Sequence, residues 1–394
     1  MRSLWRTVGK DVWLWELSLV AWGLLASYLL SAHGHLDWTG HALGRDFVKY
    51  WTAGHLVAEG RIADIFNPDV FLGQEHRLFD VRLPFHFWSY PPPALLLVSP
   101  LALTSYMPGL FLWSLAGLIA LYPALRAWTS LGPTPTRWLW LILLSPAVAT
   151  NIALGQNGAF TAALLIGGVA LIEKRPTWAG VLFGLLIFKP QIGLLIPVAV
   201  LAGRHWKVFL AAAVAGCLVL ALSALVYGLD AWHGFLGPTL KMQTLMLRQG
   251  RGPFQWMMPS AFMAARGLGI RWTWAMAIQA PFTLAAIVTV WITWARREVS
   301  FQLKGAVLMM ATFVASPQAF NYDLVPAAAA ALLLWRRDRV VGQGLAVAVW
   351  ALPVLMIALQ AVHIVVTPIV LTWAMVELAR QAAPRRQPLG FPTA

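Results

Sequence analysis

The chain has 394 residues, of which 59% are hydrophobic and only 11% are charged. Soluble domains carry about 25% charged residues, so this composition excludes an ordinary soluble protein and predicts an integral membrane protein. The net charge of +14 does not indicate nucleic-acid binding, because most Lys and Arg residues stand in short clusters between apolar runs, as the positive-inside rule produces. The single cysteine, Cys217, excludes a disulfide framework and a cysteine-rich metal site.

The first predicted span, Val12–Leu30, follows a basic N-terminal segment, residues 1–10. This segment has no small-residue cleavage site, so we expect a retained signal anchor with a cytoplasmic N-terminus. The polar loop that follows, residues 31–90, is then external. It holds seven of the fifteen carboxylates and six of the nine histidines, and a long polar loop in such an apolar chain usually carries function.

Two short amphipathic helices are expected within this loop, Phe47–Glu59 and Pro68–Phe79, both lying along the membrane surface. The next apolar run, Pro91–Leu103, is too short to span and predicts a re-entrant segment. Eleven further spans are expected near Met107–Leu125, Trp138–Ile152, Gly158–Ile172, Thr177–Phe188, Gln191–Leu201, Val208–Val226, Trp272–Ala295, Gly305–Ala315, Tyr322–Trp335, Val340–Met356 and Ile357–Ala379.

The predicted fold is therefore an all-α polytopic bundle of about 10–13 transmembrane helices, forming one domain over residues 1–379. A second external loop is expected at 227–259, and residues 380–394 are expected to form a disordered cytoplasmic tail. With twelve spans, the basic clusters fall on the cytoplasmic side. The polar turns near 156, 189 and 316–323 then fall on the external side, together with the 31–90 loop.

Asp46 is the leading catalytic candidate. A carboxylate at the external membrane face can take a proton from an incoming hydroxyl and so activate it as a nucleophile. The alternative is a helix N-cap, because Asp46 precedes the helix predicted from Phe47 and Asp is favoured at that position. Asp64 is a weaker candidate, for which capping or turn formation is the better interpretation.

Lys189 lies between two apolar half-helices, where an unpaired lysine is costly, by about 2.5–3.5 kcal/mol on insertion scales. It predicts either a contact with an anion such as a lipid phosphate or a lysine that reaches the headgroups. The turn Gly155-Gln156-Asn157 offers two amides and a following helix N-terminus to a sugar or a phosphate. Ordinary turn chemistry is the alternative for that turn.

A fourth group of polar residues, at 316–323, contains Gln318, Tyr322 and Asp323. Tyr322 offers a ring and a hydroxyl to a sugar, whereas Asp323 has the alternative role of capping the next span. Arg248 and Arg251 are weaker candidates for clamping a phosphate. The loop histidines lack metal-ligand spacing, so no metal site is predicted.

Together, these motifs resemble glycosyltransferase family 87. Its motifs occur here in the family's order, over about residues 44–335, as Asp46-Phe47 with Tyr50 and Ala53-Gly54, Tyr90-Pro91-Pro92, Gly155-Gln156-Asn157, Lys189-Pro190-Gln191, and Ser316-Pro317 with Tyr322-Asp323. The resemblance implies a GT-C fold, a polyprenyl-phosphate-linked sugar donor (most commonly mannose), and inverting transfer on the external face. It also implies that no metal and no cofactor take part, and that Asp46 is the base.

The residues expected to bind substrate are Arg45, Tyr50, Gln156, Asn157, Lys189, Gln191, Arg251, Gln318, Tyr322 and Asp323. Many relatives have a histidine after the Ser-Pro motif, where this chain has Gln318. This departure shifts the expected binding of the donor phosphate to Lys189 and Arg251.

The sequence thus predicts a bacterial inner-membrane glycosyltransferase that moves a hexose from a polyprenyl-phosphate donor to a lipid or glycan hydroxyl. The rival hypothesis is a transporter or flippase of a lipid-linked or small polar substrate, which broken helices at Lys189-Pro190 and Pro317 would suit. The absence of an internal sequence repeat speaks against a transporter. A structural membrane subunit is the third hypothesis.

Overall fold

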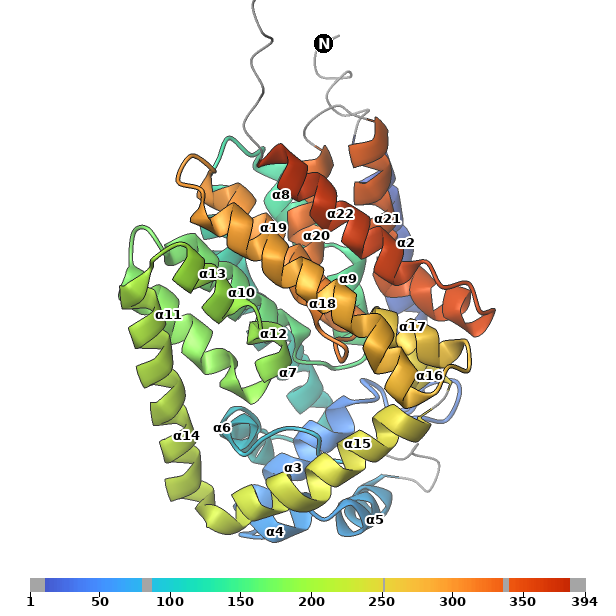
Figure 1. Ribbon diagram of the computed structural model, residues 1–394. Helices are drawn as coiled ribbons and strands as arrows, with labels where there is room; N and C mark the ends of the chain where they lie inside the picture. The colour runs from blue at the N-terminus through green and yellow to red at the C-terminus, as the bar shows by residue number, and fades with distance from the viewer. Residues whose placement is uncertain (1–10, 80–86, 251, 336–339, 383–394) are drawn as a thin grey trace, which may run out of the picture.

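The computed structural model describes residues 11–79, 87–250, 252–335 and 340–382. Within these residues every regular element is a helix, which confirms the predicted all-α polytopic membrane protein (Figure 1). The described segments long and apolar enough to cross a membrane are α2 (Val12–Leu30), α7 (Tyr106–Thr129), the helical run Trp206–Gln249, α18 (Trp272–Ala295) and α21 (Val340–Ala361). The basic segment 1–10 and most of the predicted tail, 383–394, lie outside the described residues.

The remaining apolar helices are shorter. They are α8 (Arg137–Leu143), α9 (Pro146–Ala153), α10 (Gly158–Leu171), α11 (Pro176–Leu185), α12 (Pro190–Gly193), α13 (Ile196–Ala202), α19 (Phe301–Ala315), α20 (Val325–Trp335) and α22 (Thr367–Gln381). Nearly every residue of α10, α19 and α20 is buried. A helix that is apolar on all sides belongs at the centre of a bundle, and these three form the core.

Proline marks two helix starts. Pro146 is the first residue of α9 and lies inside a predicted span, whereas Pro190 is the first residue of α12 and lies at a break that was predicted. Proline suits the first turn of a helix, where its missing N–H needs no partner, but it cannot continue the helix before it. The span predicted at Trp138–Ile152 is therefore two helices, α8 and α9, with a break at Leu144 and Ser145.

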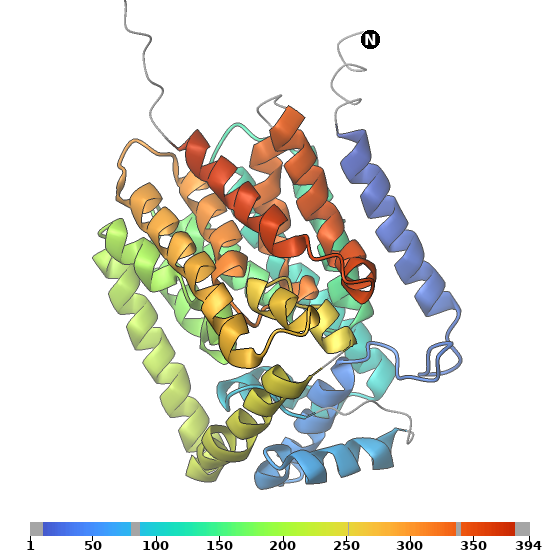
Figure 2. The same ribbon diagram turned by 45° about the vertical axis from the view of Figure 1, so that its right-hand side comes forward.

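A layer of short helices lies across one end of the bundle, opposite the start of α2 and the end of α22 (Figures 1 and 2). It comes from the long polar loop and the apolar run after it. Its members are α3 (Phe47–Ala58), α4 (Ile62–Ile65), α5 (Pro68–Leu78), α6 (Pro93–Val98) and the 3-10 turn η1 (Ser99–Leu103). The two amphipathic helices and the short non-spanning segment predicted here are all present.

The predicted loop at 227–259 is largely helical instead. Helix α14 (Trp206–Gly234) has a kink at Gly228, where φ is +77°. It then continues through η3 (Phe235–Thr239) into α15 (Leu240–Gln249), which passes across the layer of short helices (Figure 1). Two further short helices follow, α16 (Pro253–Trp256) and α17 (Ala261–Gly267). A polar helix and a polar loop have the same low hydropathy, so hydropathy alone could not distinguish the helix α15 from a loop.

Candidate active site

A cavity of about 520 Å³ opens between the layer of short helices and the bundle. Its polar lining consists of Arg45, Asp46, Lys49, Ser89, Tyr90, Lys189, Gln191, Gln243, Gln318 and Tyr322. The apolar part of the wall includes five residues from the segment after α14, namely Phe235, Leu240, Met246, Phe254 and Met257. The cavity therefore combines charged side chains with a largely apolar wall.

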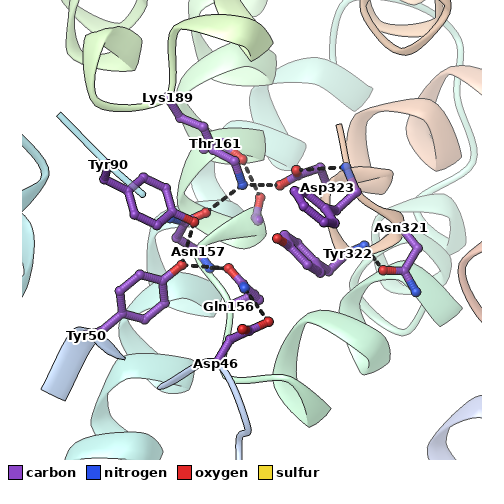
Figure 3. Close-up of polar contacts among 12 residues, drawn as sticks. Asp46, Tyr50, Tyr90, Gln156, Asn157, Thr161, Lys189, Asn321, Tyr322 and Asp323 are labelled. Carbon is purple, nitrogen blue, oxygen red and sulfur yellow. Dashed lines mark hydrogen bonds and ion pairs between the residues drawn. The ribbon is translucent and has the colours of Figure 1, made fainter. Parts of the chain in front are cut away.

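Asp46 stands at the N-cap position of α3, yet it binds side chains. Within the described chain, no capping hydrogen bond runs from its carboxylate to the backbone of α3. Its Oδ2 accepts a hydrogen bond from Gln156 Nε2 at 2.6 Å (Figure 3). Its Oδ1 lies 3.1 Å from Lys49 Nζ. The carboxylate is thus held in place at the cavity wall with 20% of its side chain exposed.

Lys49 follows Asp46 by three residues and faces the same cavity. Burial disfavours its ammonium, but Asp46, with smaller contributions from Tyr90 and Glu75, more than offsets that effect, so the pKa of Lys49 is raised. Its Nζ also lies 5.6 Å and 5.9 Å from the ring centres of Tyr50 and Tyr90. Lys49 is therefore a charged lysine inside the site.

Gln156 connects Asp46 to a chain of tyrosine hydroxyls. Tyr50 donates to Gln156 Oε1 at 2.6 Å, and the Tyr50 and Tyr90 hydroxyls are 2.7 Å apart (Figure 3). Burial raises the pKa of Tyr50 well above its ordinary value, so its hydroxyl stays protonated. With Oε1 occupied by Tyr50, the amide Nε2 of Gln156 is directed at Asp46.

Two glycines let the 155–158 turn touch both sides of the site. Gly155 has a φ of +59°, and a Cβ there would lie 2.5 Å from the Cβ of Phe47 and 2.7 Å from the carbonyl oxygen of Gly44. A Cβ on Gly158 would collide with the carbonyl of Tyr322. Only glycine permits such close approach, so these positions bring Asp46, Gln156 and Tyr322 together.

Lys189 forms a buried ion pair beside the turn. Its Nζ lies 2.6 Å from Asp323 Oδ1 and 2.8 Å from Asn157 Oδ1, and the two charged side chains are 1% and 0% exposed. The ammonium is also 5.0 Å from the ring centre of Tyr322, which stacks on Phe320. Asp323 Oδ2 accepts a hydrogen bond from the Phe320 N–H at 3.3 Å. The charge of Lys189 is balanced from within the protein.

The structure sorts the residues predicted to form the site into three groups. Those that line the cavity are Arg45, Asp46, Lys189, Gln191, Gln318 and Tyr322. Those that lie behind its wall and hold the lining residues are Tyr50, Gln156, Asn157 and Asp323. Arg251 lies outside the described residues. Substrate binding by these residues stays a prediction.

Sequence reasoning did not select Lys49 or Tyr90 as site residues. Lys49 carried a usable signal, because it is a lysine one helical turn after Asp46 on an otherwise apolar helix. Tyr90 belongs to the Tyr90-Pro91-Pro92 motif but was given no binding role, and its contact with Tyr50 depends on tertiary structure. Among the described residues, no group of three or more His, Cys, Asp or Glu side chains could hold a metal ion.

Comparison with known proteins gives one match. The model of glycosyltransferase family 87 matches residues 88–317, more than half of the chain. The chain belongs to glycosyltransferase family 87. This confirms the predicted family and makes the protein a membrane glycosyltransferase. The search of curated proteins and the search of solved structures give no match.

The region matched to glycosyltransferase family 87 includes the 155–157 turn, Lys189-Pro190-Gln191 and Ser316-Pro317. It begins after Asp46 and ends before Tyr322. The family match therefore supports a transferase without assigning the base, and the role of Asp46 depends on its place in the cavity.

Proposed function

We propose that this glycosyltransferase moves a hexose, with mannose as the first candidate, from a polyprenyl-phosphate donor to a hydroxyl group of a lipid or glycan acceptor. The observation that carries the proposal is the single cavity that joins Asp46 and Lys189 to a largely apolar wall. A lipid-linked sugar needs an apolar surface for its chain and polar groups for its phosphate. The proposed setting is the external face of a bacterial inner membrane.

In the proposed reaction, Asp46 accepts the proton of the acceptor hydroxyl while the hydroxyl oxygen attacks C1 of the sugar. The bond between C1 and the phosphate oxygen breaks, and the polyprenyl phosphate leaves with the electron pair. Attack from the side opposite the leaving group inverts the configuration at C1. The leaving phosphate needs nearby positive charge more than it needs a proton, and the lysines of the cavity supply that charge.

The test is a transfer assay on the purified full chain in nanodiscs, with radiolabelled polyprenyl-phosphate hexoses and a lipid extract as acceptor. We expect label to move from one donor to a new lipid or glycan, with inverted stereochemistry and without loss of activity in EDTA. Nucleotide sugars serve as competing donors. Transfer from a nucleotide sugar instead, or flux of a lipid-linked substrate across liposomes without transfer, would contradict the proposal.

A further inference from the structure

Three cations at the cavity wall each pair with a carboxylate. The pairs are Arg45–Asp37 at 2.8 Å, Lys49–Asp46 at 3.1 Å and Lys189–Asp323 at 2.6 Å. A cation that is already paired attracts an anionic substrate less strongly, so a substrate gains the most positive charge from a pair that separates.

The Lys49–Asp46 pair differs from the other two. The carboxylates of Asp37 and Asp323 are 0% exposed, so moving their cations away would leave a buried negative charge. Asp46 and Lys49 both line the cavity, with 20% and 11% of their side chains exposed. When Lys49 leaves, Asp46 keeps the hydrogen bond from Gln156 and contact with the cavity.

We propose that Lys49 is the side chain that binds the donor phosphate, and that it leaves Asp46 to do so. A lysine has a long flexible stem and a compact charge, which suits a move of this kind within a cavity. The inference rests on the proposed function. It assigns to Lys49 a binding role that the sequence analysis gave to other residues.

The exchange couples the two substrates. A carboxylate paired with an ammonium is a weak proton acceptor, and it becomes a stronger one when the ammonium moves to another anion. Donor binding therefore switches on Asp46 as the base, so the donor binds before productive attack by the acceptor. After transfer the leaving phosphate monoester carries more negative charge than the donor diester, and Lys49 binds it more strongly.

The test measures binding of polyprenyl monophosphate, the sugar-free product, to the full chain in nanodiscs. Lys49→Met should weaken binding at least about tenfold, and Lys49→Arg should restore most of it. Asp46→Asn should tighten binding, because it frees Lys49, and this gain should vanish in the Lys49→Met background. Lys241→Met, an exposed lysine on α15, is the matched control and should bind as the wild type does.

A second readout separates a binding role from a structural one. Lys49→Met should raise the KM for donor at least about tenfold and change the KM for acceptor little. The acidic limb of its pH–rate profile should move to higher pH, because Asp46 is protonated more easily without the ammonium. Lys49 also lowers the pKa of Glu75, so both proteins are compared in the Glu75→Gln background, where that carboxyl cannot titrate. Tyr90 and Tyr50, which also lie near Lys49, are present in both proteins.

Unchanged phosphate binding in Lys49→Met, or weaker binding in Asp46→Asn, would overturn the inference. Failure of the wild type to transfer sugar from any lipid-linked donor would instead overturn the proposed function. The two failures are distinguishable, because a wild type that transfers sugar and a Lys49→Met variant with unchanged donor KM contradict only the role of Lys49.

Discussion

At the scale of single residues, two lysine–aspartate pairs of the site differ in how far the cavity reaches them. Lys189 and Asp323 are both buried. Lys189 also donates a hydrogen bond to Asn157 Oδ1, and Asp323 also accepts one from the Phe320 N–H. Lys49 and Asp46 both face the cavity. The first pair therefore holds the framework of the site, and the second pair is available to respond to substrate.

Lys189→Met should destabilise the protein by about 3–5 kcal/mol, because it leaves the Asp323 carboxylate buried without its cation. Replacing both residues, as in Lys189→Met with Asp323→Leu, should recover much of that loss. The measurement is the free energy of unfolding in detergent for the two variants and the wild type. Equal stabilities of the single variant and the wild type would show that the buried pair does not form.

Glu75 makes stability depend on pH. Burial raises the pKa of this α5 carboxyl from its usual 4.5 to about 8, and Lys49 opposes the rise only in part. Between those pH values the folded chain holds a proton that the unfolded chain has released. Stability should therefore fall as pH rises through this window, by at most about 1.4 kcal/mol per pH unit.

Thermal unfolding in detergent at pH 5 and pH 8 tests this dependence. Glu75→Gln should lose most of the difference between the two pH values, because the substituted amide does not titrate. Glu59→Gln, at a side chain 49% exposed, should keep it. A pH slope that survives in Glu75→Gln would assign the dependence to other groups.

At the scale of elements, the 155–158 turn joins parts that are far apart in the chain. It places Gln156 against Asp46, at the start of α3, and Asn157 against Lys189, before α12. It also meets the Tyr322 carbonyl at Gly158. A change in the turn should therefore move both lysine–aspartate pairs at once.

Gly155→Ala should lower transfer at least about tenfold and cost about 1–3 kcal/mol of stability, because the new methyl group pushes α3 away from the turn. Gly60→Ala is a matched control. Both glycines have positive φ, +59° and +72°, but a Cβ at Gly60 meets open space. Transfer rates and unfolding temperatures that fall equally in both variants would indicate backbone strain alone.

Helix α15 contributes an apolar wall to the cavity through Leu240 and Met246. If this wall holds the donor's lipid chain, Met246→Gln should raise the KM for a long-chain donor several-fold. The KM for a donor with a very short chain should hardly change. Leu245→Gln, on the same helix outside the cavity lining, is the control, and equal effects on both donors would contradict the assignment.

Hydropathy was sufficient to predict some elements and not others. It placed α2 and α18 at their observed bounds, because each is a long apolar run between polar residues. It could not show that the chain resumes a helix after the kink at Gly228 and continues along α15, because polar helices lack a hydropathy signal. The break at Pro146 follows from backbone chemistry, but hydropathy averages over it. The break at Pro190 was predicted, because polar residues flank it there.

At the scale of the whole molecule, motifs far apart in sequence lie around one cavity. The order of the motifs was enough to predict the family, which the match over 88–317 confirms. It was also enough to select Asp46 and Lys189. The pairing of Asp46 with Lys49 was open to prediction from their spacing of three residues on a helix. The pairing with Gln156 was not, because it joins residues 110 positions apart and depends on how the turn packs against α3.

The most direct test of Asp46 as the base is single-turnover transfer by Asp46→Asn loaded with labelled donor. We expect donor binding at least as tight as in the wild type and a transfer rate lower by about 10²–10⁴-fold, the usual contribution of a general base. Asp64→Asn, whose carboxylate pairs with Arg61 away from the cavity lining, should transfer normally. Transfer by Asp46→Asn at the wild-type rate would contradict the assignment of Asp46 as the base.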